Sequence, residues 1–248
     1  MKRILRNLGF GLLAVILLVL VGFTVWAANP AAPDQTALDA LSSNQLVDYQ
    51  NKDGWLIFTP NDIQPTTGFI IYPGARVDYR AYAPAARDIS ASGFTVIVVK
   101  MPLNFAFFGI NQASKVMATF PEITHWAVGG HSLGGAMAAQ FTGANPEKVD
   151  GLVLWASYPA QSNDLSNTNV KVLSIFATND GLATLSKIDA SRPILPEDTI
   201  YLEIQGGNHS GFGWYGPQNG DGEAQISKSE QQVQIVDATS LFLGTLIQ

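Results

Sequence analysis

The chain of 248 residues contains no cysteine. This absence excludes a disulfide framework, a thiolate nucleophile and every zinc or iron–sulfur site that needs cysteine ligands. Charged residues are also few, at 14%, whereas 47% of the residues are hydrophobic, so the composition is not that of a disordered chain. We therefore expect a folded protein, and we expect it to hold no metal ion or other cofactor.

Basic residues are the minority among the few charges. The chain has 14 Lys and Arg against 20 Asp and Glu, for a formal net charge of −6. Three of the basic residues, Lys2, Arg3 and Arg6, lie in an N-terminal segment free of acidic residues, which leaves 11 basic against 20 acidic residues after Ala28. An acidic surface repels the phosphates of nucleic acids, so we expect no nucleic-acid partner.

The longest uncharged run extends from Leu8 to Ala28. A helix that rises about 1.5 Å per residue would cross the ~30 Å hydrocarbon core of a bilayer over this length, which predicts a membrane anchor in residues 1–28. A cleaved signal peptide is the alternative, because Val25-Trp26-Ala27 loosely fits a cleavage site. In either case the N-terminal cations stay in the cytoplasm, and the rest of the chain is predicted to be extracytoplasmic, anchored or secreted.

Two prolines, Pro30 and Pro33, follow the apolar run and disfavour its continuation as a helix, so residues 29–43 are predicted to form a short stem. Residues 44–248 are then predicted to form one folded domain. It begins with a predicted hairpin, Leu46 to Tyr49 and Trp55 to Thr59, around the turn residues Asp53 and Gly54.

The remainder of the domain alternates apolar runs with helical patterns, which predicts about eight strands in a mostly parallel sheet with helices on both faces. The further predicted strands are Phe69 to Tyr72, Phe94 to Val99, Trp126 to Val128, Leu152 to Trp155, Val172 to Phe176 and Ile200 to Ile204. The predicted helices are Tyr82 to Ser92, Asn111 to Phe120, Leu133 to Thr142, Leu182 to Ser191 and Ser229 to Leu246.

A serine stands at one of the predicted strand-to-helix junctions. Gly130-His131-Ser132-Leu133-Gly134 matches the pattern G-x-S-x-G, in which a sharp turn raises a serine hydroxyl above the sheet. The pattern alone is short and can arise by chance, but a strand precedes it and a helix of small residues follows it. This context predicts that Ser132 is a nucleophile.

A serine hydroxyl needs a base to remove its proton, and the chain has only three histidines. We expect His131, next to the serine on a tight turn, to point away from it. His125 begins the strand that enters the turn, at the opposite edge of the sheet. His209, in a glycine-containing loop after the last predicted strand, is therefore the predicted base.

The base needs a carboxylate partner, and the chain order Ser, acid, His places that partner between Ser132 and His209. Asp180 directly follows the carboxyl end of a predicted strand, where ligand sites of such sheets gather, and is the predicted acid. Asp164, in the loop after the preceding strand, is the reserve candidate.

An attacked carbonyl becomes an oxyanion that backbone N–H groups stabilise. The predicted donors are Leu133, after the serine, and either Ala75 or Gly74, in the loop after the strand ending at Tyr72. Arg76 in the same loop is either a clamp for a substrate carboxylate or, as we favour, a surface or salt-bridge residue.

These segments resemble the bacterial "α/β-hydrolase family 5" group, which is distantly similar to dienelactone hydrolases. The resemblance covers most of Leu46 to Leu246 and rests on Tyr72-Pro73-Gly74, the run from Gly129 to Ala139, the run from Thr178 to Thr184, and Gly206-Gly207-Asn208-His209. It implies an α/β-hydrolase fold and hydrolysis of esters or lactones. Dienelactone hydrolases use cysteine where this chain has Ser132, so their particular substrate is not transferred.

The resemblance and the three candidate residues lead us to expect a membrane-tethered serine hydrolase acting on small esters. A non-catalytic binding protein that retains the fold is the alternative. Only about a dozen residues, from Tyr158 to Asn169, are available where such enzymes carry a lid, so we expect no large cap and a preference for short esters. The aromatic residues Phe212, Trp214 and Tyr215 after His209 could form a wall over the site or pack on the flank of the domain.

Overall fold

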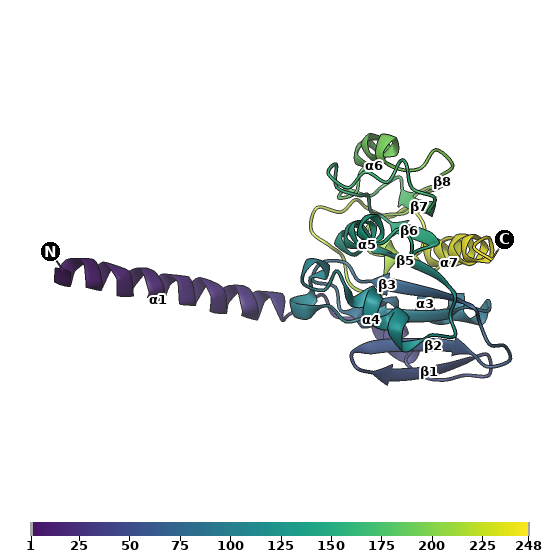
Figure 1. Cartoon of the computed structure of the whole chain (residues 1–248), viewed down its shortest axis with the longest axis horizontal. Coiled ribbons are helices and arrows are strands. Elements are labelled where there is room, and N and C mark those ends of the chain that lie inside the picture. Colours follow the sequence, from purple (N-terminus) through teal and green to yellow (C-terminus); the bar gives the residue numbers. More distant parts are fainter. Residues whose placement is uncertain (1, 248) are drawn as a thin grey trace.

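Eight strands form one sheet at the centre of the domain, in the order β1-β2-β4-β3-β5-β6-β7-β8 (Figure 1). The computed structural model describes residues 2–247. From β3 to β8 every neighbouring pair of strands is parallel, whereas β1 and β2 pair antiparallel with each other and β2 pairs antiparallel with β4. The strands are β1 (Val47–Lys52), β2 (Trp55–Pro60), β3 (Thr67–Tyr72), β4 (Thr95–Val99), β5 (His125–His131), β6 (Gly151–Trp155), β7 (Lys171–Ala177) and β8 (Ile200–Ile204). The predicted mostly parallel sheet of about eight strands is confirmed.

The hairpin of β1 and β2 forms around the two turn residues predicted for it. Asp53 and Gly54 have φ angles of 55° and 80°, the left-handed conformation that a two-residue hairpin turn requires. The turn brings Lys52 opposite Trp55 and starts the antiparallel ladder of β1 and β2.

Helices cover both faces of the sheet, as predicted. The apolar cluster on one face includes residues of α3 (Ala83–Ala91) and α7 (Lys228–Gly244), whereas the cluster on the other face includes residues of α4 (Gln112–Thr119) and α5 (Leu133–Ala144). α6 (Leu185–Ser191) lies beyond β7, near the edge of the sheet (Figure 1). The central strands β3, β4 and β6 are entirely buried, which explains their continuous apolar sequences.

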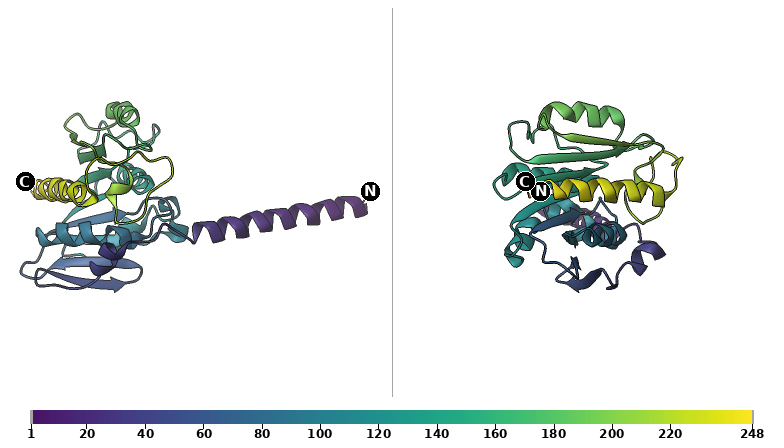
Figure 2. Two further views of the ribbon diagram at one scale, coloured as in Figure 1. Left: turned by 180° about the vertical axis from the view of Figure 1, so that it is seen from behind. Right: turned by 90° about the vertical axis from the view of Figure 1, so that its right-hand side faces the viewer.

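The apolar N-terminal run forms the long helix α1 (Lys2–Ala27), which leaves the domain on the side opposite the C-terminus (Figures 1 and 2). Its portion Gly9–Ala27 is long and apolar enough to cross a membrane and is almost entirely exposed. Residues 29–43 pack on the domain through two isolated β-bridges: Ala31 pairs with Val77, and Pro33 pairs with Tyr215. This segment also contains the short helix α2 (Gln35–Asp39), which the sequence analysis did not anticipate.

Candidate active site

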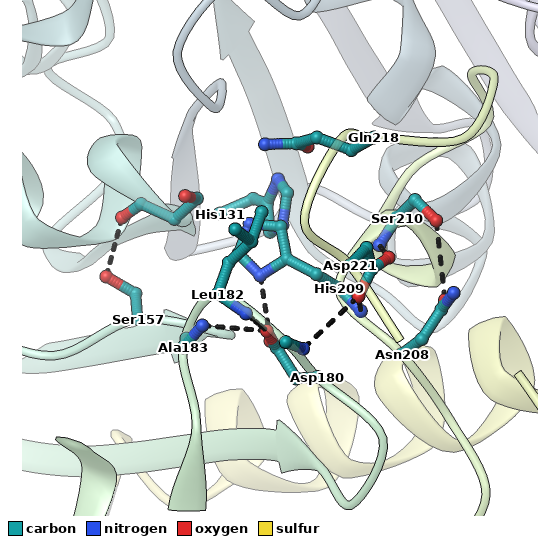
Figure 3. A network of polar contacts seen from close by, with 12 residues as sticks. His131, Ser157, Asp180, Leu182, Ala183, Asn208, His209, Ser210, Gln218 and Asp221 are labelled. Carbon is teal, nitrogen blue, oxygen red and sulfur yellow. Dashed lines mark hydrogen bonds and ion pairs between the residues drawn. The ribbon is translucent and has the colours of Figure 1, made fainter. Parts of the chain in front are cut away.

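Ser132 stands at the turn between β5 and α5 in a conformation that few residues adopt. Its φ and ψ angles are 54° and −124°, a region in which a residue with a side chain is strained. Two hydrogen bonds hold Ser132 there. The Ser132 N–H donates to the Trp155 carbonyl (2.9 Å), and the Ser157 hydroxyl donates to the Ser132 carbonyl (2.6 Å; Figure 3). The neighbouring strand β6 and the residues after it thus fix the serine.

Close packing around the turn leaves no room for side chains at Gly130 and Gly134, on either side of Ser132. A Cβ atom on Gly130 or Gly134 would collide with the carbonyl oxygen of Tyr72, at the end of β3. We call residues 130–135 the serine turn. Its glycines let β5 and α5 approach the loop after β3, which carries Gly74 and Ala75.

His209 and Asp180 form a buried pair. The distance from His209 Nδ1 to Asp180 Oδ2 is 2.8 Å, and the two residues are 0% and 5% exposed. The other carboxylate oxygen, Oδ1, accepts the N–H groups of Leu182 and Ala183, each at 2.7 Å (Figure 3). Because a carboxylate only accepts hydrogen bonds, Nδ1 carries the proton and Nε2 is the basic nitrogen of His209.

The basic nitrogen of His209 and the serine face one cavity. Nε2 is buried and has no hydrogen-bond partner within residues 2–247. His209 and Ser132 line a cavity of about 240 Å³ together with Ala156, Tyr158 and Leu182, among others. The structure shows no hydrogen bond between the two side chains, a contact that often tightens only when substrate is bound. It therefore brings the predicted serine, acid and histidine to one place.

The structure distinguishes between the two alternative oxyanion donors of the loop after β3. The Gly74 N–H donates to the Tyr82 hydroxyl (2.9 Å) and is already engaged. In the described part of the chain the N–H groups of Ala75 and Leu133 donate to no backbone or side-chain acceptor, and Leu133 is the first residue of α5, where no preceding carbonyl is available. Leu133 and Ala75 remain as the candidate donors.

His131 packs against the candidate base, a contact that its position beside Ser132 in the sequence did not indicate. Its ring is fully buried, 4.4 Å from the His209 ring centroid and stacked on Phe212, and its Nδ1 is 2.9 Å from the Tyr82 hydroxyl. Burial, and secondly the nearby His209, hold the pKa of His131 well below its usual range. Sequence reasoning set this residue aside and did not anticipate its contact with His209.

Asp221 is the second residue that the sequence analysis missed. Its Oδ1 accepts the N–H groups of His209 (3.0 Å) and Gly222 (2.8 Å), and its Oδ2 accepts the N–H of Ser210 (2.8 Å; Figure 3). We call residues 206–222 the histidine loop, and Asp221 closes this loop on itself. No local motif signals the contact, because Asp221 follows His209 by twelve residues of irregular chain.

Other candidate residues lie elsewhere. His125 begins β5, 3.7 Å from Asp150, at the strand end opposite Ser132. Asp164 is exposed and accepts the N–H of Ser166, so it has no contact with His209. Arg76 is partly exposed and forms no salt bridge within residues 2–247, so of the favoured surface or salt-bridge role only the surface position is found. Its guanidinium donates to the Trp26 and Asn29 carbonyls at the end of α1.

The aromatic residues after His209 follow the second of the two predicted arrangements. Phe212 and Tyr215 are 0% and 2% exposed and belong to the apolar core, so they form no wall over the cavity. Trp214 is partly buried, and its backbone N–H donates to the Ala81 carbonyl. Within residues 2–247 no group of three or more Asp, Glu and His side chains is arranged to hold a metal ion.

Comparison with known proteins identifies relatives of this fold. The family model described as "Alpha/beta hydrolase family" matches residues 68–233. No curated protein sequence matches the chain at a significant level.

Among similar solved structures is a dienelactone hydrolase from Anabaena variabilis (TM-score 0.61, 13% identity, 79% of this chain and 96% of that chain covered). Another is the esterase Est2 from Thermogutta terrifontis (TM-score 0.58, 10% identity, 83% and 94% covered). A third is Est1E from Butyrivibrio proteoclasticus (TM-score 0.57, 12% identity, 82% and 99% covered). At these identities the similarity shows the fold, and the predicted α/β-hydrolase fold is confirmed.

Proposed function

The chain belongs to the alpha/beta hydrolase family, and from this premise we propose that it is a serine hydrolase that cleaves small carboxylic esters or lactones through an acyl-enzyme. The buried pair of His209 and Asp180 carries the proposal, because it leaves Nε2 unpartnered in the cavity that Ser132 lines. A fold retained only for binding has no use for this arrangement.

In the proposed mechanism the Ser132 hydroxyl attacks the ester carbonyl carbon while its proton passes to Nε2 of His209. Asp180 stabilises the imidazolium that results. The N–H groups of Leu133 and Ala75 bind the oxyanion. His209 then protonates the departing alcohol, and in the second half of the reaction it takes a proton from the water that hydrolyses the acyl-enzyme.

The size of the cavity supports a compact substrate. Its volume of about 240 Å³ lies below the ~300–1,000 Å³ of typical ligand pockets, and residues 158–169 form turns and extended chain without a helical lid. We expect p-nitrophenyl acetate and butyrate to be hydrolysed with higher kcat/KM than the palmitate. Values of kcat/KM that rise steadily toward palmitate would contradict a small acyl site.

We further propose that α1 anchors the protein in a membrane with the catalytic domain outside the cytoplasm, by the positive-inside rule. Carbonate-resistant membrane fractionation and protease accessibility from the outer side are the expected results. A mature N-terminus near Ala28 would instead make the protein secreted, and a domain accessible only from the cytoplasm would contradict both arrangements.

Labelling with a fluorophosphonate probe tests the proposed chemistry, because the probe phosphonylates activated serines. We expect one adduct on the peptide containing Ser132 in the wild type and none in Ser132→Ala. The matched control is Ser162→Ala, which removes an exposed serine outside the cavity and is expected to remain labelled. Ser157, the other serine of the cavity, is expected to carry no adduct. Failure of the wild type to react, or an adduct on Ser157, would overturn the assignment and favour the binding-protein alternative.

A further inference from the structure

The end of α1 is fixed to the same edge of the domain as the candidate active site. Arg76, in the loop after β3, donates from Nη2 to the Asn29 carbonyl (2.7 Å) and from Nε to the Trp26 carbonyl (3.2 Å), and its guanidinium lies 4.1 Å from the centre of the Trp26 ring. The side-chain amide of Asn104 donates to the Ala27 carbonyl (2.8 Å). These contacts bind the carbonyls at the C-terminal end of the helix and restrict its direction relative to the domain.

The segment after α1 runs along this edge. Ala31 pairs with Val77, which follows the candidate oxyanion loop, and Pro33 pairs with Tyr215, which belongs to the histidine loop. Both partners lie near the carboxyl ends of the parallel strands, where the cavity opens. If α1 spans a bilayer up to Ala27, the candidate site therefore stands at the membrane surface, and the C-terminus lies on the far side of the domain (Figures 1 and 2).

An aromatic patch continues from the helix onto the domain. The Phe105 ring lies 6.0 Å from Phe23 and 5.8 Å from Trp26, both in α1, and 5.1 Å from Phe107, which in turn lies 4.4 Å from Phe108. Phe107 and Phe108, in the short helix η3 (Ala106–Phe108), are 42% and 50% exposed.

The chemistry of the patch favours a lipid surface over a charged partner. No charged residue occurs from Met101 to Ser114, and exposed aromatic side chains beside an apolar helix are typical of the boundary between hydrocarbon and head groups. η3 also contacts α5, the helix that begins directly after Ser132. The patch is thus linked to both the helix and the serine turn.

We propose that Phe107 and Phe108 insert into the interface of the bilayer that α1 spans, so that the candidate site faces the membrane surface and receives esters that partition there. This inference rests on the proposed membrane anchor and on the proposed hydrolase activity. It narrows the natural substrates to compact esters that partition into membranes, while soluble activated esters such as p-nitrophenyl acetate still reach the site.

The absence of cysteine makes the test direct, because each single-cysteine variant carries one label. Phe108→Cys, Leu17→Cys in α1 and Leu241→Cys in α7 are labelled with a nitroxide, and the full chain is reconstituted in phosphatidylcholine vesicles. Electron paramagnetic resonance then compares the collisions of each label with oxygen, which is enriched in lipid, and with a water-soluble nickel chelate. We expect the labels at 17 and 108 to favour oxygen and the label at 241, which is 75% exposed in the native residue, to favour the chelate.

Each other outcome contradicts the inference in a recognisable way. A label at 108 that behaves like the one at 241, while that at 17 stays in lipid, leaves the anchor standing and overturns the docking. Labels at both 17 and 108 in water overturn the anchor and the docking together. A label at 108 shielded from both reagents, with label-to-label coupling, shows a second copy of the chain on the patch and overturns the bilayer as occupant.

An activity measurement separates docking from chemistry. Phe107→Ser/Phe108→Ser is expected to hydrolyse soluble p-nitrophenyl acetate like the wild type but to lose about tenfold in rate on an ester incorporated in the same vesicles, since burial of a Phe side chain contributes about that factor or more. The control Val233→Ser/Leu241→Ser changes two exposed apolar residues of α7 and is expected to leave both rates unchanged. Absence of any hydrolysis in the wild type would instead contradict the proposed function, and equal rates of both double variants on the vesicle-bound ester would contradict the docking.

Discussion

The serine turn and the histidine loop line the same cavity, but different contacts hold them in place. The serine turn is fixed mainly by steric contact, because its glycines pack against the Tyr72 carbonyl. Two hydrogen bonds of the Ser132 backbone, to the Trp155 carbonyl and from the Ser157 hydroxyl, hold Ser132 in its strained conformation. Everything that shapes it lies within a few residues or in the next strands of the sheet.

The histidine loop is fixed by polar side chains. Asp221 accepts N–H groups from His209 and Ser210, and the buried Gln231 of α7 bonds the backbone of Asn208 in both directions, at 3.1 Å and 2.8 Å. Asp180 completes the set through Nδ1 of the imidazole. Added volume should therefore disrupt the serine turn, whereas loss of a single acceptor should loosen the histidine loop.

The largest effect is expected at the contact that orients the imidazole itself. Asp180→Asn retains one oxygen for the Leu182 and Ala183 N–H groups but can present an amide NH₂ to Nδ1, which favours the wrong tautomer of His209. We expect kcat for a p-nitrophenyl ester to fall by about 10⁴-fold with little change in the melting temperature. Asp164→Asn is the matched control, and a larger loss there would move the acid to that position.

Added volume in the serine turn is expected to cost stability as well as activity. In Gly134→Ala the new Cβ meets the Tyr72 and Pro73 carbonyl oxygens, and backbone cannot move aside as a flexible side chain can. We expect a loss of about 3 kcal/mol in the free energy of unfolding, measured by urea titration in detergent micelles. Gly216→Ala, whose Cβ would meet no atom within 4 Å, serves as control, and equal stability of the two variants would refute the steric account.

Loss of one acceptor in the histidine loop is expected to have a smaller effect. Asp221→Asn keeps one acceptor oxygen, but its NH₂ group replaces the other. That NH₂ group is a donor and cannot accept the backbone N–H that the carboxylate oxygen accepted. A loosened His209 should lower kcat by about 10- to 100-fold, the equivalent of one or two charge-assisted hydrogen bonds, while KM changes little. Amide hydrogen exchange of residues 208–212 should accelerate, and Glu223→Gln, directly after the loop, should change neither quantity. Unchanged kcat in Asp221→Asn would show that the loop is held without this carboxylate.

The smallest effect concerns the pH dependence of stability. The folded protein keeps His131 neutral because burial lowers its pKa, whereas the unfolded chain protonates it below its usual pKa of about 6.5. The unfolded chain thus binds a proton that the folded protein does not. The free energy of unfolding therefore decreases as the pH falls below about 6.5, by up to about 1.4 kcal/mol per pH unit. Urea titrations between pH 7.5 and 5 should give a shallower pH dependence for His131→Gln than for wild type or His125→Gln. Parallel curves would be inconsistent with a buried neutral His131.

The two regions also differ in how far the sequence predicts them. The serine turn and the buried strands follow from local patterns, because a glycine-flanked serine between an apolar run and a helix defines its own environment. His131 and Asp221 could not be found in this way, since their partners Tyr82 and the N–H groups of the histidine loop meet them only in the folded chain. The packing of residues 29–43 on the domain was missed for the same reason: prolines indicated the end of the helix but gave no information on the surface that the chain would follow.

The proposed mechanism requires that Ser132 carry an acyl group during turnover. Wild-type protein mixed with p-nitrophenyl acetate in a quench-flow instrument should release a burst of nitrophenolate equal to the concentration of protein, and intact-mass analysis of the quenched sample should find one acetyl group, on the peptide containing Ser132. Ser132→Ala should show neither burst nor adduct. A burst with the acetyl group on another residue, or turnover of Ser132→Ala at the wild-type rate, would contradict the proposed mechanism.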